Sequence, residues 1–242
     1  MCTVTFIPGR DKIFLTSNRD EKNFRSPALP PRIFEFDSGK ILFPKDGDAG
    51  GTWIASHENG NAVVFLNGGL VFHRSAPPYK KSRGLILLDL IDSATPYNSF
   101  LAINLTNIEP FTAIIWDDKH LFECRWDGQL KHQQEMDKTI SHIWSSVTLY
   151  DEEIISKRKS WFDNWISNNN EPLQKEILDF HQFTGDGDSN NDLLMNRDGK
   201  VFTVSITSMA IGDEMINMQY LDLKTNKSSV FDLSIEKPMA SR

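Results

Sequence analysis

Apolar and polar residues alternate in short runs toward both ends of the chain, with the two-residue period of β-strands. Residues 8–11 and 58–60 separate neighbouring runs and are rich in turn-forming residues. The first two runs are therefore predicted to form a hairpin. The predicted strands are 2–7, 12–17, 40–43, 52–56, 62–66, 201–208, 217–223 and 228–233.

The middle of the chain has the longer spacing of helices. In residues 83–93, Leu85, Leu88 and Ile91 recur every three positions, and 97–104, 151–167 and 171–180 are also predicted to be helical. Strands are expected at 111–116, 120–126 and 140–149, and an irregular stretch at the proline-rich residues 26–31. This order predicts an α+β fold of antiparallel sheets with helices on their outer faces. With no repeat or linker, residues 1–242 are expected to form one domain.

The composition and net charge of the chain limit the kinds of function that it is expected to have. Of the 242 residues 39% are hydrophobic, including sixteen Phe and six Trp, which is enough for a large core. The net charge is −7 and the basic residues are scattered, so we expect a small-molecule ligand and no nucleic acid. Only two cysteines are present, the start lacks the layout of a signal peptide, and no apolar run approaches the ~20 residues of a membrane span. We therefore expect a cytoplasmic protein.

Cys2, which follows the initiator Met1, is the first candidate for chemistry. If Met1 is removed, one residue carries both a thiol, whose pKa is ordinarily about 8.5, and an α-amine, whose pKa is ordinarily about 7.7–8.0. The amine can then take the thiol proton. The competing interpretation is a small apolar residue at the start of a strand, which is the commoner role of a free cysteine.

Four motifs follow in order: Cys2-Thr-Val-Thr-Phe, Asn-Arg-Asp-Glu at 18–21, Gly-Gly-Thr-Trp at 50–53 and a run ending in Leu-Asn at 66–67. In this order and spacing they resemble the family named for its Asn-Arg-Asp-Glu motif, which includes the Transport and Golgi organisation protein 2 group. That family is similar to the N-terminal-nucleophile hydrolases, near the choloylglycine hydrolases and penicillin acylases. The resemblance implies a four-layer αββα sandwich, and it is strong over about residues 1–90.

The 18–21 motif supplies groups that could organise a thiolate. The predicted hairpin brings it beside Cys2, where Arg19 would lower the pKa of the thiol and Asp20 would orient the amine. Asn18 and Glu21 would contact substrate. The acid of the related hydrolases follows the arginine by three residues, so Asp20 and Glu21 both remain candidates. A solvated turn is the alternative for the whole motif.

Other residues have open alternatives. Asn67, which matches the Leu-Asn pair of the acylases, would donate to an oxyanion or sit in a turn before Gly68. Trp53 would line the pocket or pack in the core, and Arg83 would bind a substrate anion or lie on the surface. Ser146 stands where the family often has Ser-Asn, and this departure favours a different substrate or no hydrolysis.

These residues predict an amidohydrolase or acyltransferase acting through Cys2 on a small non-peptide amide, with a thioester second. Cys2, Arg19, Asp20 and Asn67 are the candidate catalytic residues. The histidines lack ligand spacing and no nucleotide motif occurs, so we expect neither a metal nor a cofactor. One alternative is a non-catalytic carrier for a lipid, an acyl coenzyme A or a haem-like ligand. Another is a structural module that retains Met1.

Overall fold

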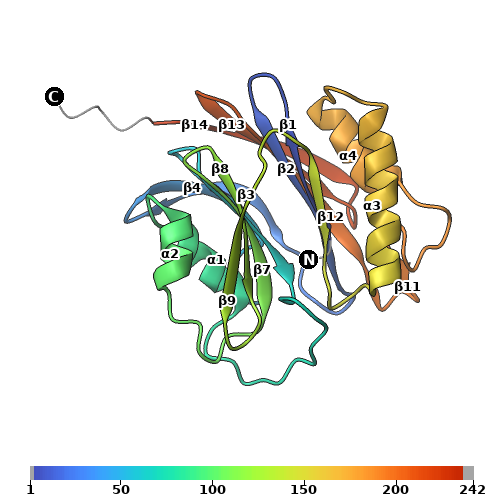
Figure 1. The fold of residues 1–242 in the computed structure, drawn as a ribbon, viewed down its shortest axis with the longest axis horizontal. Coiled ribbons are helices and arrows are strands. Elements are labelled where there is room, and N and C mark those ends of the chain that lie inside the picture. The colour runs from blue at the N-terminus through green and yellow to red at the C-terminus, as the bar shows by residue number, and fades with distance from the viewer. Residues whose placement is uncertain (1–2, 237–242) are drawn as a thin grey trace.

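Strand pairing divides the molecule into two antiparallel sheets (Figure 1). The computed structural model describes residues 3–236. The first sheet runs in the order β10 (His142–Ser145), β1 (Thr3–Pro8), β2 (Ile13–Lys22), β12 (Val201–Ile211), β13 (Met215–Asp222) and β14 (Lys227–Ser234), and β11 (Asn196–Arg197) pairs with β12. The second runs in the order β3 (Leu29–Phe36), β4 (Gly39–Lys45), β5 (Ile54–His57), β6 (Ala62–Asn67), β7 (Phe111–Asp117), β8 (His120–Trp126) and β9 (Lys131–Met136).

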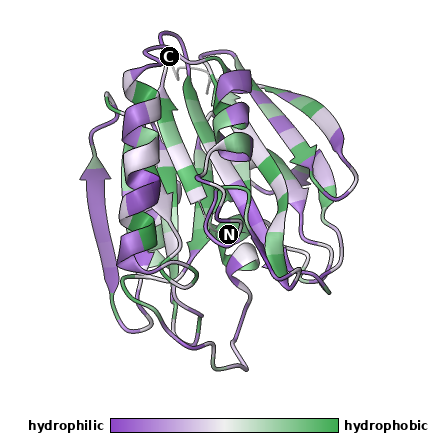
Figure 2. Ribbon diagram, turned by 90° about the vertical axis from the view of Figure 1, so that its right-hand side faces the viewer, coloured by the Kyte–Doolittle hydropathy of each residue, from purple (hydrophilic) through white to green (hydrophobic). Residues whose placement is uncertain are grey.

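Helices cover the outer face of each sheet. α1 (Arg83–Ile91) and α2 (Pro96–Ala102) pack on β5, β6 and β7, while α3 (Glu152–Ser167) and α4 (Gln174–Phe183) pack on β2, β10 and β12. Figure 2 views the protein from the side of α3, whose hydrophilic and hydrophobic residues are interleaved as in an amphipathic helix. The four-layer α+β arrangement is therefore confirmed.

Each interface between layers has its own apolar core. Val4, Phe6 and Leu15 of the first sheet meet Val64 and Ile114 of the second between the two sheets. A second core lies under α1 and α2, and a third under α3 and α4. Both faces of the central strands are thus buried, which explains why all seven residues of β7 are buried and why its apolar residues do not simply alternate with polar ones.

Most of the predicted elements form, and the main differences lie in β2, β3, β9 and β10. The first hairpin forms, but β2 runs on to Lys22, so the interpretation of residues 18–21 as a turn is wrong. β3 begins at Leu29 inside the stretch expected to be irregular; its prolines are tolerated because β3 is an edge strand with a register shift after Leu29. β9 was missed because its residues are polar, and β10 is shorter than the predicted 140–149.

Candidate active site

A cleft of about 360 Å³ opens where β2, β6 and the start of α1 come together. It brings together five of the candidate residues: Arg19, Glu21, Trp53, Asn67 and Arg83. Motifs that lie far apart in the sequence therefore share one site. Its other lining residues are Arg25, Asp46, Ala49, Gly51, Thr52, Phe65, Tyr79, Lys81, Ser82, Gly84 and Glu109.

The alternation of side chains along β2 divides the 18–21 motif between two faces of the sheet. Arg19 and Glu21 face the cleft. Asn18 and Asp20 face the opposite way, toward the layer that contains α3 and α4, and neither lines the cleft. The expectation that all four residues serve one pocket is thus not met, because neighbouring strand residues point to opposite sides.

Arg19 is held on three sides in the cleft. Its Nη2 lies 2.5 Å from Asp46 Oδ2 and 3.8 Å from Glu21 Oε1, and its guanidinium stacks 4.6 Å from the centre of the Trp53 ring. The side chain is only 3% exposed. Arginine's planar charge suits stacking and ion pairing at once, so the guanidinium is fixed in position.

Asp46 is the acid that the sequence did not reveal. Burial alone would raise the pKa of its carboxyl, but the Ala49 N–H and the charges of Arg19 and Arg25 outweigh burial and lower that pKa. Arg25 Nη2 donates to Asp46 Oδ1 over 2.7 Å. One carboxylate thus bridges two arginines, and because its pKa is lowered it is ionised at neutral pH.

Close packing between Gly51 of the Gly-Gly-Thr-Trp motif and Gly84 of α1 explains why the motif has glycine at residue 51. A Cβ on Gly51 would lie 2.4 Å from the carbonyl carbon of Gly84, and one on Gly84 would lie 2.8 Å from Thr52 O. Thr52 N–H donates to Gly84 O over 3.2 Å. The main chain before Trp53 therefore packs directly on the first turn of α1, and this packing builds the cleft wall.

The cleft contains hydrogen-bond donors without partners. Among residues 3–236, neither Trp53 Nε1 nor Ser82 Oγ has a partner, although both atoms are buried. Trp53 is 4% exposed, and Ser82 is the N-cap of α1 but makes no capping hydrogen bond through its side chain. An unpaired buried donor costs about 1–3 kcal/mol. A ligand with acceptor oxygens would recover part of that cost.

Asn67 lies at the end of β6 and is one of the residues that line the cleft. Ser146 does not line the cleft: its hydroxyl donates to Asn67 O over 2.8 Å and contacts Thr148 Oγ1. The hydroxyl predicted to contact substrate instead ties the end of the second sheet to the segment after β10. Gly68 follows at φ +87°, so the chain turns immediately after Asn67.

Arg83, which lines the cleft at the start of α1, contacts Pro110 and Glu109. Its Nη1 donates to Pro110 O over 3.2 Å and its Nη2 lies 3.2 Å from Glu109 Oε2. The other oxygen of Glu109 lies 3.5 Å from His73 Nε2. Arg83 therefore belongs to a charged group at the mouth of the cleft and is not an isolated surface residue.

Asn18 has a structural position. Its amide nitrogen donates to the carbonyls of His181 and Leu193 over 3.1 and 2.7 Å, and its oxygen lies 2.5 Å from His181 Nδ1. Thr5 Oγ1 meets the other ring nitrogen at 2.8 Å. These bonds join β1, β2 and α4 behind the cleft, and Asn18, which was predicted to contact substrate, does not line it.

Asp20 is bound in the same outer layer. Thr203 Oγ1 donates to it over 2.6 Å and Tyr150 OH over 3.0 Å. Nearby, buried Arg158 of α3 stacks on the Tyr150 ring at 3.6 Å and donates to Thr3 Oγ1. Arg158 was not predicted from the sequence because the Lys-Arg-Lys run of α3 is typical of a solvated face. It fixes the first described residue of β1.

Cys2 lies outside the described residues. The second cysteine, Cys124, is buried on β8, and burial, followed by the charge of Glu123, raises the pKa of its thiol to about 12. Such a thiol is almost wholly protonated at neutral pH and is a poor nucleophile.

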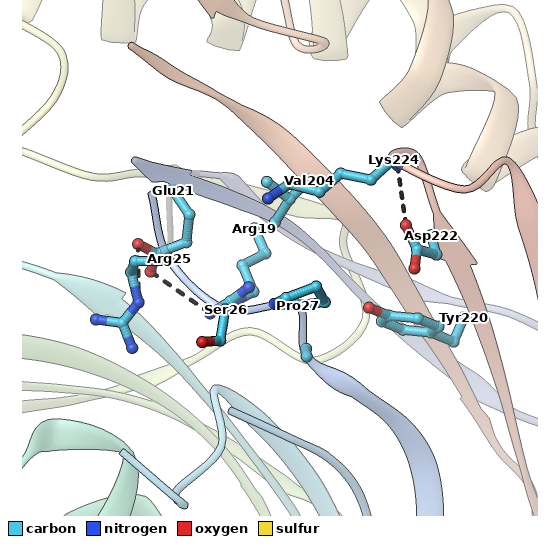
Figure 3. Close-up of a pocket in the computed structure, with 10 residues that line it drawn as sticks. Arg19, Glu21, Arg25, Ser26, Pro27, Val204, Tyr220, Asp222 and Lys224 are labelled. Carbon is cyan, nitrogen blue, oxygen red and sulfur yellow. Dashed lines mark hydrogen bonds and ion pairs between the residues drawn. The ribbon is translucent and has the colours of Figure 1, made fainter. Parts of the chain in front are cut away.

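A second cavity of only about 10 Å³ adjoins the cleft and shares Arg19, Glu21 and Arg25 with it (Figure 3). Tyr220 of β13 closes the side away from Arg25, and burial raises the pKa of its hydroxyl. This volume holds about one water molecule. Of these two cavities, only the larger cleft has room for an organic ligand.

Solved structures identify the class of fold. A mutant of conjugated bile acid hydrolase from Clostridium perfringens, with a cysteine changed to alanine, has 12% identity and a TM-score of 0.61 over 96% of this chain and 92% of that one. An N-acylethanolamine-hydrolyzing acid amidase ortholog from Caenorhabditis elegans has 11% identity and a TM-score of 0.58 over 86% and 92%. The protein thus has the fold of the N-terminal-nucleophile hydrolases.

The sequence gives the narrower assignment. The model of one family, Transport and Golgi organisation 2, matches residues 1–231, and the chain belongs to that family. Comparison with curated protein sequences finds no match. No helix within residues 3–236 is long and apolar enough to cross a membrane.

Proposed function

We propose that this protein is an amidohydrolase or acyltransferase acting through Cys2, once Met1 is removed, on a small non-peptide amide, with a thioester as the second choice. The placement of Arg19 carries the proposal. Thr3 faces Asn18 across the first hairpin, and Arg19, the next residue along β2, turns its buried guanidinium into the cleft. The proposal requires the side chain of residue 2 to point toward the cleft.

The reaction has two steps. The α-amine takes the thiol proton, the thiolate adds to the substrate carbonyl, and the C–N bond breaks as the proton passes to the leaving amine. Water, or a second amine or alcohol in an acyltransferase, then attacks the thioester on Cys2. That step releases the acid or the new ester or amide and returns the proton to the thiol.

The cleft supplies groups suited to these steps. The positive charge of Arg19 favours the thiolate, and Asp46 holds it in place. The side-chain amide of Asn67 is a candidate oxyanion donor. Trp53 Nε1 and Ser82 Oγ, which have no partners among residues 3–236, are available to acceptor atoms of the substrate. Asp20, which was expected to orient the α-amine of Cys2, is bound in the outer layer by Tyr150 and Thr203. The carboxylate in the cleft is that of Asp46, and we assign to it the positioning of Arg19.

Mass spectrometry after incubation with a reactive acyl donor tests the proposal. Intact mass should show that Met1 is absent, and peptide mapping should place the acyl group on Cys2. The Cys2→Ser variant should lose the adduct, whereas the matched Cys124→Ser variant should keep it. Retention of Met1 in natively produced protein, or acylation of Cys124 alone, would reject the proposal.

A carrier for a lipid, an acyl coenzyme A or a haem-like ligand is the second candidate. It is favoured by Ser146, whose hydroxyl is occupied by Asn67 O, so that the side chain adds no donor to the cleft. A carrier predicts tight ligand binding that survives Cys2→Ala and no turnover by the wild-type protein. Turnover that Cys2→Ala abolishes would exclude it.

A further inference from the structure

The loop of residues 68–82 connects β6 to α1 and begins and ends at the cleft. Asn67, just before it, and Tyr79, Lys81 and Ser82 at its end all line the cleft. Figure 1 shows the loop as a long excursion beyond the ends of the strands. Anything that binds this loop is therefore close to the mouth of the cleft.

The loop exposes three consecutive large apolar side chains. Leu70 is 46% exposed, Val71 73% and Phe72 63%. No other such run of exposed large apolar residues occurs in residues 3–236, where the remaining exposed ones are separated in the sequence. Single exposed apolar residues are common on protein surfaces, but a contiguous run marks a binding surface.

The charge of the loop is opposite to that of the whole protein. Residues 68–82 contain Arg74, Lys80 and Lys81 but no Asp or Glu, whereas the chain carries a net charge of −7. Lys81 pairs with Asp89 over 2.5 Å, and no acidic residue among residues 3–236 forms an ion pair with Arg74 or Lys80. The apolar run 70–72 is thus followed by two cations that have no ion pair among residues 3–236, on a chain of net negative charge.

The base of the loop is fixed while its tip projects. His73 contacts Glu109 at 3.5 Å, Tyr79 OH accepts from Ala76 N–H at 2.8 Å, and Lys80 N–H donates to Asn107 O at 2.9 Å. Because these contacts already hold the loop in place, binding through residues 70–72 would cost little additional conformational entropy.

We propose that this loop docks the protein on an anionic lipid bilayer, with Leu70, Val71 and Phe72 inserted into the interface and Arg74 and Lys80 on the phosphates. A short exposed apolar run followed by cations matches a bilayer surface, which is apolar below a negative layer. Docking would hold the cleft mouth against the membrane, where an acylated substrate could pass into it. Only this last consequence rests on the proposed function.

Vesicle co-sedimentation with purified full-length protein tests the docking surface. The protein should bind vesicles of phosphatidylcholine with phosphatidylserine and bind pure phosphatidylcholine much more weakly. The double variant Arg74→Gln/Lys80→Gln should bind anionic vesicles about thirtyfold more weakly, since each cation near such a surface contributes about 1 kcal/mol. The double variant Val71→Asp/Phe72→Asp should reduce binding by more than about tenfold.

A matched control separates the loop from general apolar exposure. Phe183, at the end of α4 on the opposite helix layer, is 73% exposed, so Phe183→Asp should leave binding unchanged. Equal loss in Phe183→Asp, or no binding of the wild type to anionic vesicles, would overturn the proposal. So would a wild-type dimer that Val71→Asp/Phe72→Asp converts to monomers, because a second copy would then cover the loop. None of these results depends on catalysis.

Discussion

His181 links the stability of the protein to pH in a way that can be measured. Asn18 donates both amide hydrogens to carbonyls, so its oxygen must accept from His181 Nδ1, and Thr5 donates to Nε2. The His181 ring is therefore neutral, and each of its two nitrogens has a hydrogen-bond partner. Burial and then the charge of Arg158 lower the pKa of His181 from 6.5 to about 3.

The change in the free energy of unfolding with pH follows from the different pKa of His181 in the folded and unfolded states. The unfolded state takes up a proton near pH 6.5, while the folded state keeps His181 neutral until about pH 3. The stabilising contribution is complete above pH 6.5 and is lost as the pH falls toward 3. Between pH 7 and pH 5 the free energy of unfolding should decrease by about 2 kcal/mol, with a slope approaching about 1.4 kcal/mol per pH unit.

Urea unfolding at half-unit steps from pH 7 to pH 5 measures this slope. His181→Asn, whose amide can still donate to Asn18, should flatten it even if the variant is less stable throughout. His120→Gln, at an exposed position on β8, should keep the wild-type slope. A wild-type slope near zero, or a His181 ring that titrates near pH 6.5 by NMR, would refute the reasoning.

Three further changes probe the cleft and its surroundings. Gly84→Ala should lower the free energy of unfolding by about 1–3 kcal/mol in urea, because the new Cβ would lie 2.8 Å from Thr52 O. In the control Gly212→Ala the new Cβ has no neighbour inside 3.6 Å, so the free energy of unfolding should change much less. Asp46→Asn should cost roughly 2–4 kcal/mol by the same assay, and its contribution in the wild type should fade only below pH 4, as the lowered pKa requires. Cys124 should resist alkylation in the native state at pH 7.5, where a pKa of about 12 leaves a thiolate fraction near ~3 × 10⁻⁵; rapid labelling would contradict its burial.

Local pattern was enough to predict most elements of the fold. The two-residue alternation gave the first hairpin and the closing strands, and the three- to four-residue spacing gave all four helices to within a few residues. It failed at β3, where prolines sit on an edge strand, and at β9, whose side chains are polar. Both errors depend on the position of a strand in its sheet, which no local window contains.

In the candidate site, too, some features could be predicted from the sequence and others depend on the tertiary structure. The sequence by itself determined which motifs are candidates for chemistry, and five of the residues chosen from them line one cleft. Only the tertiary structure decided that Arg19 faces the cleft while Asn18 and Asp20 face α3 and α4, and that Asp46 holds the guanidinium. The physical reason is that residue types and spacing are local, whereas the face a strand residue occupies depends on what packs against each side of the sheet.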